Sequence, residues 1–418
     1  MTINNEHNKL NVPNKREQNQ TCLDSAEREE LRPKGNVPNL RFPEFQGEWE
    51  KCKLGDIINF STTRVNSSEL NKDNYVSTEN MLQDYQGIVK AKSVPEDVNV
   101  VSFSCGDILI SNIRPYLKKV WKATFNGGCS SDVFVLKAND NIESDYLHYV
   151  IANDKFINFV MSGAKGVKMP RGDKKQMETY SLSLPQIQEQ HKIVRLLSLL
   201  DERISTQNKI IEDLKKLKSA IIEKHYRQTE KNEVCVADLG NHFNVGNLAK
   251  DDLSETGKPC IIYGELFTTY GEIISQIESH TNKTEGMILS KKGDLLFPSS
   301  TTVDAVSLIA PSVINVDNVI LGGDMFGIHV SHNYNAQYLS YYFNHIAKKQ
   351  LAKFAKGSTI IHLHYTDIEK AKLFLPSLEE QNRMAMCLVA LDKKVSVEQN
   401  LLSSLTCQKS YLLQQMFI

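Results

Sequence analysis

Two basic runs in the first half of the chain carry side chains that could bind nucleic-acid phosphates. The run SNIRPYLKKVWK (111–122) interleaves arginine and lysine with aromatic residues, and GAKGVKMPRGDKK (163–175) adds glycines that let a backbone come close to a ligand. Such a mixture suits a surface that grips DNA, although an ordinary solvated face would use the same residues. The DNA-binding candidates in these runs are Arg114, Tyr116, Lys118, Lys119, Lys165, Lys168, Arg171 and Lys174.

Motifs of the common enzyme classes are absent from the sequence. It has no GxxxxGK[ST] phosphate loop, no GxGxxG fingerprint, no HExxH, no GxSxG and no proline-pair signature of an amino-methyltransferase. His362 and His364 would share one face of a strand close to Tyr365, Asp367 and Glu369, so a metal or acid–base site is geometrically possible. The matching segment of the first half, KGVKMPRGD, has no histidine, which disfavours a shared catalytic role. We therefore predict no catalytic residue, no bound cofactor and no metal in this chain.

The chain contains one unit twice, and this repeat sets the expected architecture. GDIL at 106–109 returns as GDLL at 293–296, AKG at 164–166 as AKG at 355–357, and LSLPQIQEQ at 182–190 as LFLPSLEEQ at 373–381, at offsets of 187, 191 and 191. Each copy begins with short β-rich runs and helical segments, and it ends in one long helix entered after Pro185 or Pro376. We predict an α+β fold with two tandem α/β domains, each followed by a long helix.

A hydroxyl-rich run, PSSTTVD (298–304), stands in the second copy where the first has SNIRPYLKK. Serine and threonine could read base edges or phosphates through hydrogen bonds, although a turn would use the same residues. The two copies thus share a scaffold and differ at the expected contact surface, as two readers with different targets would. The DNA-binding candidates in this copy are Ser299, Ser300, Thr301, Thr302, Lys356, Thr359 and His362.

Apolar residues at a 4,3,4,3 spacing run through both long helices, which is typical of a coiled coil. A helix of about 40 residues extends ~60 Å at ~1.5 Å per residue, and its apolar stripe needs a partner. The stripes consist of Ile193, Leu197, Leu200, Ile204, Ile211, Leu214 and Ile221 in the first helix and of Met384, Leu388, Leu391, Val395, Leu402, Leu405 and Leu412 in the second.

The simplest partner for each long helix is the other one, since the chain contains two that match. We predict an antiparallel coiled coil with pseudo-two-fold symmetry; the alternative is that each helix packs on its own domain. Gln207 and Glu398 interrupt the two stripes at the same level. They either set the register between the helices or face solvent or a third protein.

The composition limits the function classes. The 418 residues include 49 basic and 50 acidic side chains, which argues against coating DNA by bulk charge and points to local patches or a partner. No stretch approaches the ~18 apolar residues of a membrane span, and the polar N-terminus has no signal core, so we expect a cytoplasmic protein without membrane contact. The eight scattered cysteines lack the short spacings of zinc or dithiol sites and are expected to be buried or idle thiols.

Taken together, residues 37–418 resemble the DNA-specificity subunits of type I restriction-modification systems. No single short motif decides this; the duplicated order of variable domain, Leu-Pro entry, Glu-Gln and long helix is the specific feature. The segments that carry the resemblance are NVPNLRFPEFQGEWEKCKLGD (36–56), GDILISNIRPYLKKV (106–120), SGAKGV (162–167), KGSTIIHLHYTDIEK (356–370), and LSLPQIQEQHKIVRLLSLLDERI (182–204) with its copy LFLPSLEEQNRMAMCLVALDKKV (373–395).

The resemblance implies two target-recognition domains, each reading one half of a split DNA site, with the helices setting the gap. It also implies double-stranded DNA, two methylation subunits that bind S-adenosylmethionine and methylate adenine, and motor-nuclease subunits that use ATP and Mg²⁺ as partners in phage defence. The expected organisation is a flexible N-terminal extension at 1–36, target-recognition domain 1 at 37–185, the central helix at 186–226, target-recognition domain 2 at 227–376 and the C-terminal helix at 377–418.

Two other functions compete with this interpretation. A stand-alone sequence-specific DNA-binding protein would have to bind its site tightly without partners, which the near-neutral charge disfavours. A cytoplasmic coiled-coil scaffold would use the two domains to bind proteins and the helices only to space them. Specific binding to a split DNA site would exclude the scaffold.

Overall fold

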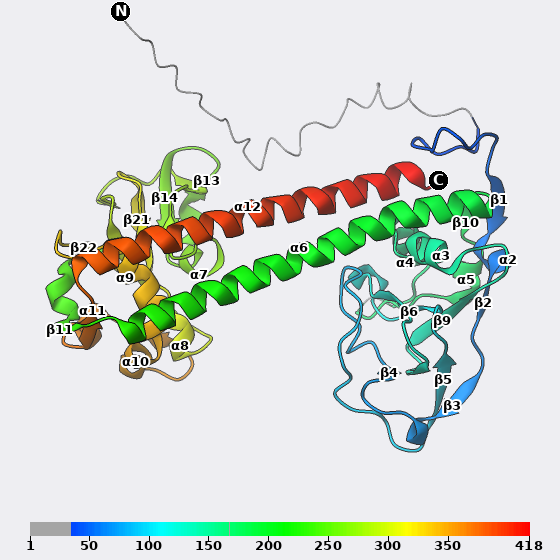
Figure 1. Ribbon diagram of the computed structural model, residues 1–418, viewed down its shortest axis with the longest axis horizontal. Helices are drawn as coiled ribbons and strands as arrows, with labels where there is room; N and C mark the ends of the chain where they lie inside the picture. The colour runs from blue at the N-terminus through cyan, green and yellow to red at the C-terminus, as the bar shows by residue number, and fades with distance from the viewer. Residues whose placement is uncertain (1–34, 167) are drawn as a thin grey trace, which may run out of the picture. The chain divides into compact units, whose positions relative to one another are not determined.

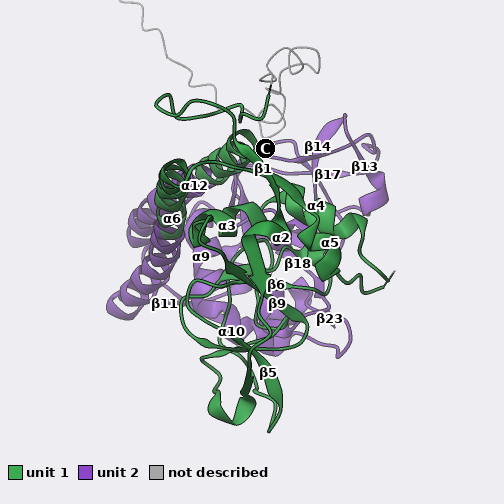
Figure 2. Ribbon diagram, turned by 90° about the vertical axis from the view of Figure 1, so that its right-hand side faces the viewer, with its two compact units in different colours: residues 1–205, 403–418 green, residues 206–402 purple. Residues whose placement is uncertain are grey.

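The computed structural model describes residues 35–166 and 168–418 and divides into two compact units (Figure 2). Unit 1 contains the chain up to Ser205 together with Ser403–Ile418, and unit 2 contains Thr206–Leu402. Each unit therefore holds one domain and a part of both long helices. Of the N-terminal extension expected at 1–36, only residues 35 and 36 lie within the described ranges.

The domain in unit 1 is built from two small sheets and a strand pair at its entrance. One sheet has the antiparallel order β2-β9-β6-β7 and the other the order β3-β5-β8-β4, while β1 pairs with β10 so that the segments entering and leaving the domain lie side by side. The strands are β1 (Glu50–Lys53), β2 (Ile58–Phe60), β3 (Arg64–Asn66), β4 (Tyr75–Val76), β5 (Asn99–Phe103), β6 (Ile108–Ser111), β7 (Val120–Lys122), β8 (Gly127–Cys129), β9 (Val133–Ala138) and β10 (Ser181–Leu184).

Helices α3 (Ser144–Ile151) and α4 (Asp154–Ser162) pack with the sheet β2-β9-β6-β7 and form the core of unit 1 with it (Figure 1). Their N-termini are fixed by side-chain caps, because Glu143 accepts a hydrogen bond from the Tyr146 amide and Asn153 accepts one from the Lys155 amide. Tyr146 and Phe156 from these helices are fully buried. The helices of this domain are α2 (Leu54–Ile57), η2 (Ser67–Glu69), η3 (Pro115–Leu117), α3 (Ser144–Ile151), α4 (Asp154–Ser162) and α5 (Lys174–Glu178).

Unit 2 repeats this plan with larger sheets. The sheet β12-β22-β18-β20-β15 contains the fully buried strand β18, and the second sheet has the order β13-β16-β14-β21-β17. The pair β11-β24 corresponds to β1-β10, since both join the entry of a domain to its exit. The strands are β11 (Asn232–Cys235), β12 (Gly240–Asn244), β13 (Leu253–Ser254), β14 (Lys258–Ile262), β15 (Ile273–Ile274), β16 (Ser279–Thr281), β17 (Ile288–Leu289), β18 (Asp294–Pro298), β19 (Ser300–Thr301), β20 (Ser312–Ile314), β21 (Ile320–Gly322), β22 (Met325–Val330), β23 (Ile361–His362) and β24 (Lys372–Leu375).

The helices of the second domain lie mainly between β19 and β24 in the chain. They are η4 (Val236–Leu239), η5 (Lys250–Asp252), α7 (Glu265–Thr268), α8 (Ala305–Leu308), α9 (Ala336–Tyr342), η6 (Phe343–Ala347), α10 (Lys348–Leu351), η7 (Ala352–Phe354) and α11 (Tyr365–Ile368). The predicted α+β fold, with two repeated domains each followed by a long helix, is confirmed. No helix in the described ranges has the length and apolarity needed to cross a membrane.

The two long helices run antiparallel to each other inside each unit. α6 spans Ile187–Gln228 and α12 spans Leu378–Met416, where the sequence predicted 186–226 and 377–418 (Figure 1). In unit 2, Gln207 contacts Glu398 and His225 contacts Glu380, so that residue numbers rise along one helix and fall along the other. The Gln207 amide donates to the Glu398 carbonyl oxygen over 3.1 Å and also to its carboxylate, and both residues are buried. The shared polar position is therefore a contact between the helices.

Both arrangements expected for the long helices occur together. Ile193 and Leu197 join the core of the first domain and Met384 and Leu388 that of the second, so each helix packs on its own domain as well as on the other helix. Most of the remaining stripe residues are buried or half-buried. Lys218 of α6, which is not one of the apolar stripe residues, is also buried.

Candidate nucleic-acid interface

Three short extended segments of unit 1 bring the basic candidates together. The Arg114 amide donates to the Pro170 carbonyl over 2.7 Å, and the Gly172 amide donates to the Asn112 carbonyl over 2.8 Å. Lys165 and Arg171 exchange two backbone hydrogen bonds of 3.1 and 2.9 Å. We call residues 112–114 and 168–172, together with Lys165, loop pair 1.

The cations of loop pair 1 point to solvent. Arg114, Lys165 and Lys168 are exposed, and Arg114 has a left-handed backbone with φ of 50° at the start of η3. The guanidinium of Arg171 donates to Asp132 over 2.9 Å, which fixes the plane of a side chain that is still half exposed. A fixed guanidinium among exposed lysines suits contact with a phosphate or a base edge.

Three other lysine candidates have partners inside the unit. Lys118 forms an ion pair of 2.8 Å with Asp154, and Lys119 donates to the Thr78 carbonyl over 2.5 Å. Burial lowers the pKa of Lys119, and the charge of Arg114 lowers it further. The Lys174 ammonium lies about 5 Å from the ring centres of Phe60 and Phe134. These contacts hold the lysines in place, while the Tyr116 ring is half exposed beside them.

Unit 2 builds the same backbone arrangement from a different sequence. The backbone amide of Ser299 donates to the Asp324 carbonyl over 2.8 Å, as the backbone amide of Asn112 donates to the Asp132 carbonyl over 2.9 Å in unit 1. The Leu363 amide donates to the Ser299 carbonyl over 2.9 Å, and Lys356 and His362 exchange hydrogen bonds of 2.9 and 2.7 Å. We call residues 299–303 and 359–363, together with Lys356, loop pair 2. Four candidates of each set therefore lie at equivalent places of the repeated fold, namely Arg114, Lys165, Lys168 and Arg171 in unit 1 and Thr301, Lys356, Thr359 and His362 in unit 2.

The hydroxyl groups of loop pair 2 differ in their exposure. Ser299 and Ser300 are buried, whereas Thr302 and Thr359 are exposed and Thr301 is half-buried. Gly357 shapes the turn before Thr359 with φ of 110°, and a Cβ there would lie 2.1 Å from the Ile360 carbonyl oxygen. The threonines are thus the hydroxyl candidates that solvent can reach.

His362 of loop pair 2 and the nearby His364 lie beside an ion pair that joins Lys356 to Asp367. The ring centres of His362 and His364 are 6.1 Å apart, and Asp367 accepts a hydrogen bond from the His364 amide and forms an ion pair with Lys356. The hydrogen bonds to Asp367 lower its pKa. In residues 35–166 and 168–418 no group of three or more histidine, cysteine or carboxylate side chains is arranged to hold a metal ion.

A repeated tyrosine–aspartate–lysine contact, missed in the sequence, holds each domain to both long helices. In unit 1 the Tyr149 hydroxyl donates to Asp201 over 2.9 Å, and Lys409 of α12 pairs with the same carboxylate over 2.5 Å. We call this contact lock 1; lock 2 consists of the residues Tyr341, Asp392 and Lys218 in unit 2. The offsets of 192, 191 and 191 from Tyr149, Asp201 and Lys218 to Tyr341, Asp392 and Lys409 are those of the repeat.

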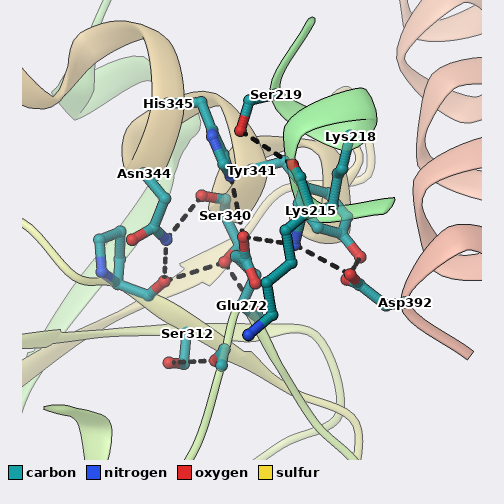
Figure 3. Close-up of polar contacts among 12 residues, drawn as sticks. Lys215, Lys218, Ser219, Glu272, Ser312, Ser340, Tyr341, Asn344, His345 and Asp392 are labelled. Atoms are coloured by element: carbon teal, nitrogen blue, oxygen red, sulfur yellow. Dashed lines mark hydrogen bonds and ion pairs between the residues drawn. The ribbon is translucent and has the colours of Figure 1, made fainter. Parts of the chain in front are cut away.

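Lock 2 is extended by two further side chains (Figure 3). Lys218 contacts both Asp392 and Glu272 over 2.9 Å, and His345 contacts Glu272 over 2.9 Å. Burial alone would raise the pKa of Glu272, but His345 and Lys218 outweigh it and lower that pKa to about 2. Burial likewise opposes the charge of Lys218, yet the two carboxylates raise its pKa. The cluster is a compact, fully paired ionic group in unit 2.

Comparison with known proteins gives one consistent family. A model of the type I restriction modification DNA specificity domain matches residues 46–216 and again residues 229–406. The type I restriction enzyme MjaVIII specificity subunit of Methanocaldococcus jannaschii is 25% identical over 391 residues, which cover 86% of this chain and 89% of that protein. The EcoDI specificity subunit of Escherichia coli is 30% identical over 129 residues, about 30% of either chain.

Solved structures show the same fold. The S subunit of a type I restriction-modification system from M. genitalium aligns with a TM-score of 0.59 at 16% identity and covers 91% of this chain and 99% of that one. A chain from a structure that describes the complex assembly and conformational transition of a type I system aligns with a TM-score of 0.55 at 17% identity, with coverage of 88% and 97%. The two specificity-domain matches fall on the two repeats, and together with these relatives they show that the chain belongs to the specificity subunits of type I restriction-modification systems.

Proposed function

We propose that this chain reads a bipartite DNA site, with loop pair 1 in the major groove of one half-site and loop pair 2 in that of the other. The observation that carries the proposal is the repeated backbone of the loop pairs, which presents Arg114 and Arg171 in one unit and Thr301 and His362 at the equivalent places in the other. The major groove distinguishes all four base pairs, so two such readers define two different half-sites.

The basic side chains of loop pair 1 supply phosphate contacts that fix the reader on the duplex. The chain as a whole has 49 basic and 50 acidic residues, so partner subunits contribute the rest of the attraction to DNA. The long helices, whose residues belong to both units, set the number of unread bases between the half-sites.

The proposed partners are two methylation subunits and the motor-nuclease subunits of the same system, acting in the cytoplasm. Adenine methylation with S-adenosylmethionine and cleavage with ATP and Mg²⁺ take place on these partners, and this chain directs them to the site. Large apolar side chains that are exposed on the long helices offer a surface for the partners; they include Leu199, Leu217, Met386, Val397 and Tyr411.

The test is to co-express the chain with the methylation subunit in cells without other modification and to map methyl-adenine across the genome. A split motif with two defined halves and an indifferent gap is the expected result. A complex that forms and binds S-adenosylmethionine but leaves no such motif would contradict the proposal and favour a stand-alone DNA-binding protein or a scaffold.

A further inference from the structure

The two loop pairs present different chemistry at equivalent backbone positions. Arg114 corresponds to Thr301, at the offset of 187 that relates Asn112 to Ser299. Lys168 corresponds to Thr359 at the offset of 191 that relates Lys165 to Lys356, and Arg171 corresponds to His362 at the same offset. Three cationic positions of loop pair 1 are thus taken by two hydroxyl groups and an imidazole in loop pair 2.

Loop pair 1 is suited to guanine. Guanine shows two acceptors, O6 and N7, in the major groove, and the forked donors of arginine match that pair. Arg171 uses Nη1 for its bond to Asp132 and keeps further N–H donors on a guanidinium whose orientation the aspartate fixes. The Arg114 side chain is exposed on the neighbouring segment, which is joined to the Pro170 carbonyl by a hydrogen bond of 2.7 Å.

Loop pair 2 and the neighbouring helices α8 and η7 instead expose several apolar side chains. Val303 is 73% exposed and Ile360 is 50% exposed, and Val306 and Phe354 are also solvent-accessible. These four residues lie on or next to elements that contact one another, because α8, which contains Val306, contacts β19, β23 and η7. Single exposed apolar residues are common on proteins, but a group at a recognition loop indicates a contact surface.

The apolar feature of the major groove is the C5 methyl group of thymine. Guanine and cytosine offer no methyl there, so an apolar group at the tip of a DNA-reading loop selects thymine over cytosine on the facing strand. The exposed hydroxyls of Thr302 and Thr359 can bond to the thymine O4 or to a neighbouring adenine without a charge.

Building on the function proposed above, we propose that loop pair 1 reads guanine through Arg114 and Arg171, whereas loop pair 2 reads thymine through methyl contacts with Val303 and Ile360. The two half-sites then differ in the chemistry by which they are recognised as well as in sequence. A half-site read by loop pair 2 contains at least one thymine whose methyl group is buried on binding.

The experiment uses the full chain in complex with its methylation subunit and duplexes that carry the split motif found by genome mapping. Thymine is replaced by uracil, which removes only the methyl group, and guanine by 7-deazaguanine, which removes only N7, one position at a time. We expect one uracil in one half-site to weaken binding roughly fourfold, the effect of one buried methyl group. In the other half-site 7-deazaguanine is expected to weaken binding by about tenfold.

Variants assign each effect to its loop pair. In the double variant Val303→Ala and Ile360→Ala the affinity should no longer depend on the thymine methyl group. The matched control is Met169→Ala. Met169 is the exposed residue of loop pair 1 that corresponds to Ile360, and its truncation should leave the dependence of affinity on the thymine methyl group unchanged. Arg114→Ala and Arg171→Ala, made one at a time, remove the forked donors, so each should abolish the effect of 7-deazaguanine at the guanine that the replaced arginine reads.

Each alternative outcome overturns the inference and leaves the proposed function standing. Uracil without effect in both half-sites, or an effect that persists in the Val303→Ala and Ile360→Ala variant, would show that loop pair 2 does not read a methyl group. A 7-deazaguanine effect that persists at every guanine in both Arg114→Ala and Arg171→Ala would remove arginine as the guanine reader. Failure of the proposed function itself would appear earlier, as the lack of a split motif for the unaltered complex.

Discussion

Lys218 is the residue whose replacement tests the energetics of lock 2 most directly. Its side chain is 11% exposed, and its ammonium lies 2.9 Å from both Glu272 and Asp392. Lys218→Met keeps the length of the side chain and removes the charge, so two carboxylates are left facing each other without their cation. Removing one partner of a buried ion pair costs about 3–5 kcal/mol, because the remaining charge has lost its compensation.

The pKa of Glu272 gives a second measure of the same contact. The pKa falls from 4.5 to about 2, and at ~1.4 kcal/mol per unit this difference corresponds to about 3 kcal/mol of stabilisation at neutral pH, shared between His345 and Lys218. The loss expected for Lys218→Met is therefore about 3 kcal/mol, the lower end of the range for a broken buried pair, because His345 still holds part of the Glu272 stabilisation. A domain of about 200 residues loses ~2–4 °C in Tm per kcal/mol, so the melting temperature of unit 2 should fall by roughly 6–12 °C.

The assay is thermal and urea unfolding of the full chain, with amide hydrogen exchange to assign the change to unit 2. Lys409→Met is the matched control: the equivalent lysine of lock 1 is 26% exposed and pairs with Asp201, whose side chain is 37% exposed, so its loss should cost about 1 kcal/mol or less. Equal losses for the two variants, or a loss below 1 kcal/mol for Lys218→Met, would refute the assignment of lock 2 as a buried ionic group.

The Glu272 pKa also determines the direction in which the free energy of unfolding changes with pH. Because the pKa of Glu272 is lower in the folded chain, its stabilisation is fully present above pH ~4.5 and is lost as the pH falls towards 2. Lys218→Met should therefore make the free energy of unfolding less dependent on pH between about 4.5 and 2 than it is in the unaltered chain. An unchanged slope in that window would mean that Lys218 does not hold the Glu272 carboxylate in its charged form.

Three further predictions concern DNA reading and the helix pair. Inserting one heptad into both α6 and α12 should change the spacer of the methylated motif and neither half-site; a new half-site sequence in the methylation map would contradict this. Arg171→Gln should weaken DNA binding and reduce the slope of log affinity against log salt by about 1, and unchanged values of both would remove Arg171 from the interface. Gln207→Leu should destabilise the chain because the Glu398 carboxylate loses its buried donor, whereas Gln207→Leu with Glu398→Leu should restore stability in urea unfolding; a single variant as stable as the parent would exclude the contact as a determinant.

The architecture could be predicted because it depends on patterns that occur twice. The offset of 191 predicted a repeated domain and helix, and the 4,3,4,3 spacing predicted the stripe that pairs α6 with α12. Lys218 could not be found this way, because a stripe search counts lysine as a surface residue. Its burial depends on Glu272 and Asp392, which lie 54 and 174 positions away along the chain.

The sequence predicted which segments lie together in each unit, but not which of their side chains are exposed. The basic and hydroxyl runs do lie in equivalent loop pairs. Sequence alone could not show that Ser299 and Ser300 are buried or that Lys118 and Lys119 bind Asp154 and the Thr78 carbonyl, since these facts depend on tertiary contacts. The apolar residue Val303 was not a candidate, because a search for DNA-binding chemistry favours charged and polar types.

Comparing the two units of one chain separates the residues that hold the scaffold from those that we propose to read DNA. Lock 1 and lock 2 contain the same three residue types at offsets of 191 or 192, and the backbone hydrogen bonds of the two loop pairs correspond to one another. A structural role is the same in both units, so it requires the same residues. The proposed reading of two different half-sites would require different side chains on that common scaffold. The two loop pairs do differ in this way, at Arg114 and Thr301 and at Arg171 and His362. The positions where the two units differ on this shared hydrogen-bond arrangement are therefore the ones at which substitution should change the recognised sequence while leaving the fold intact.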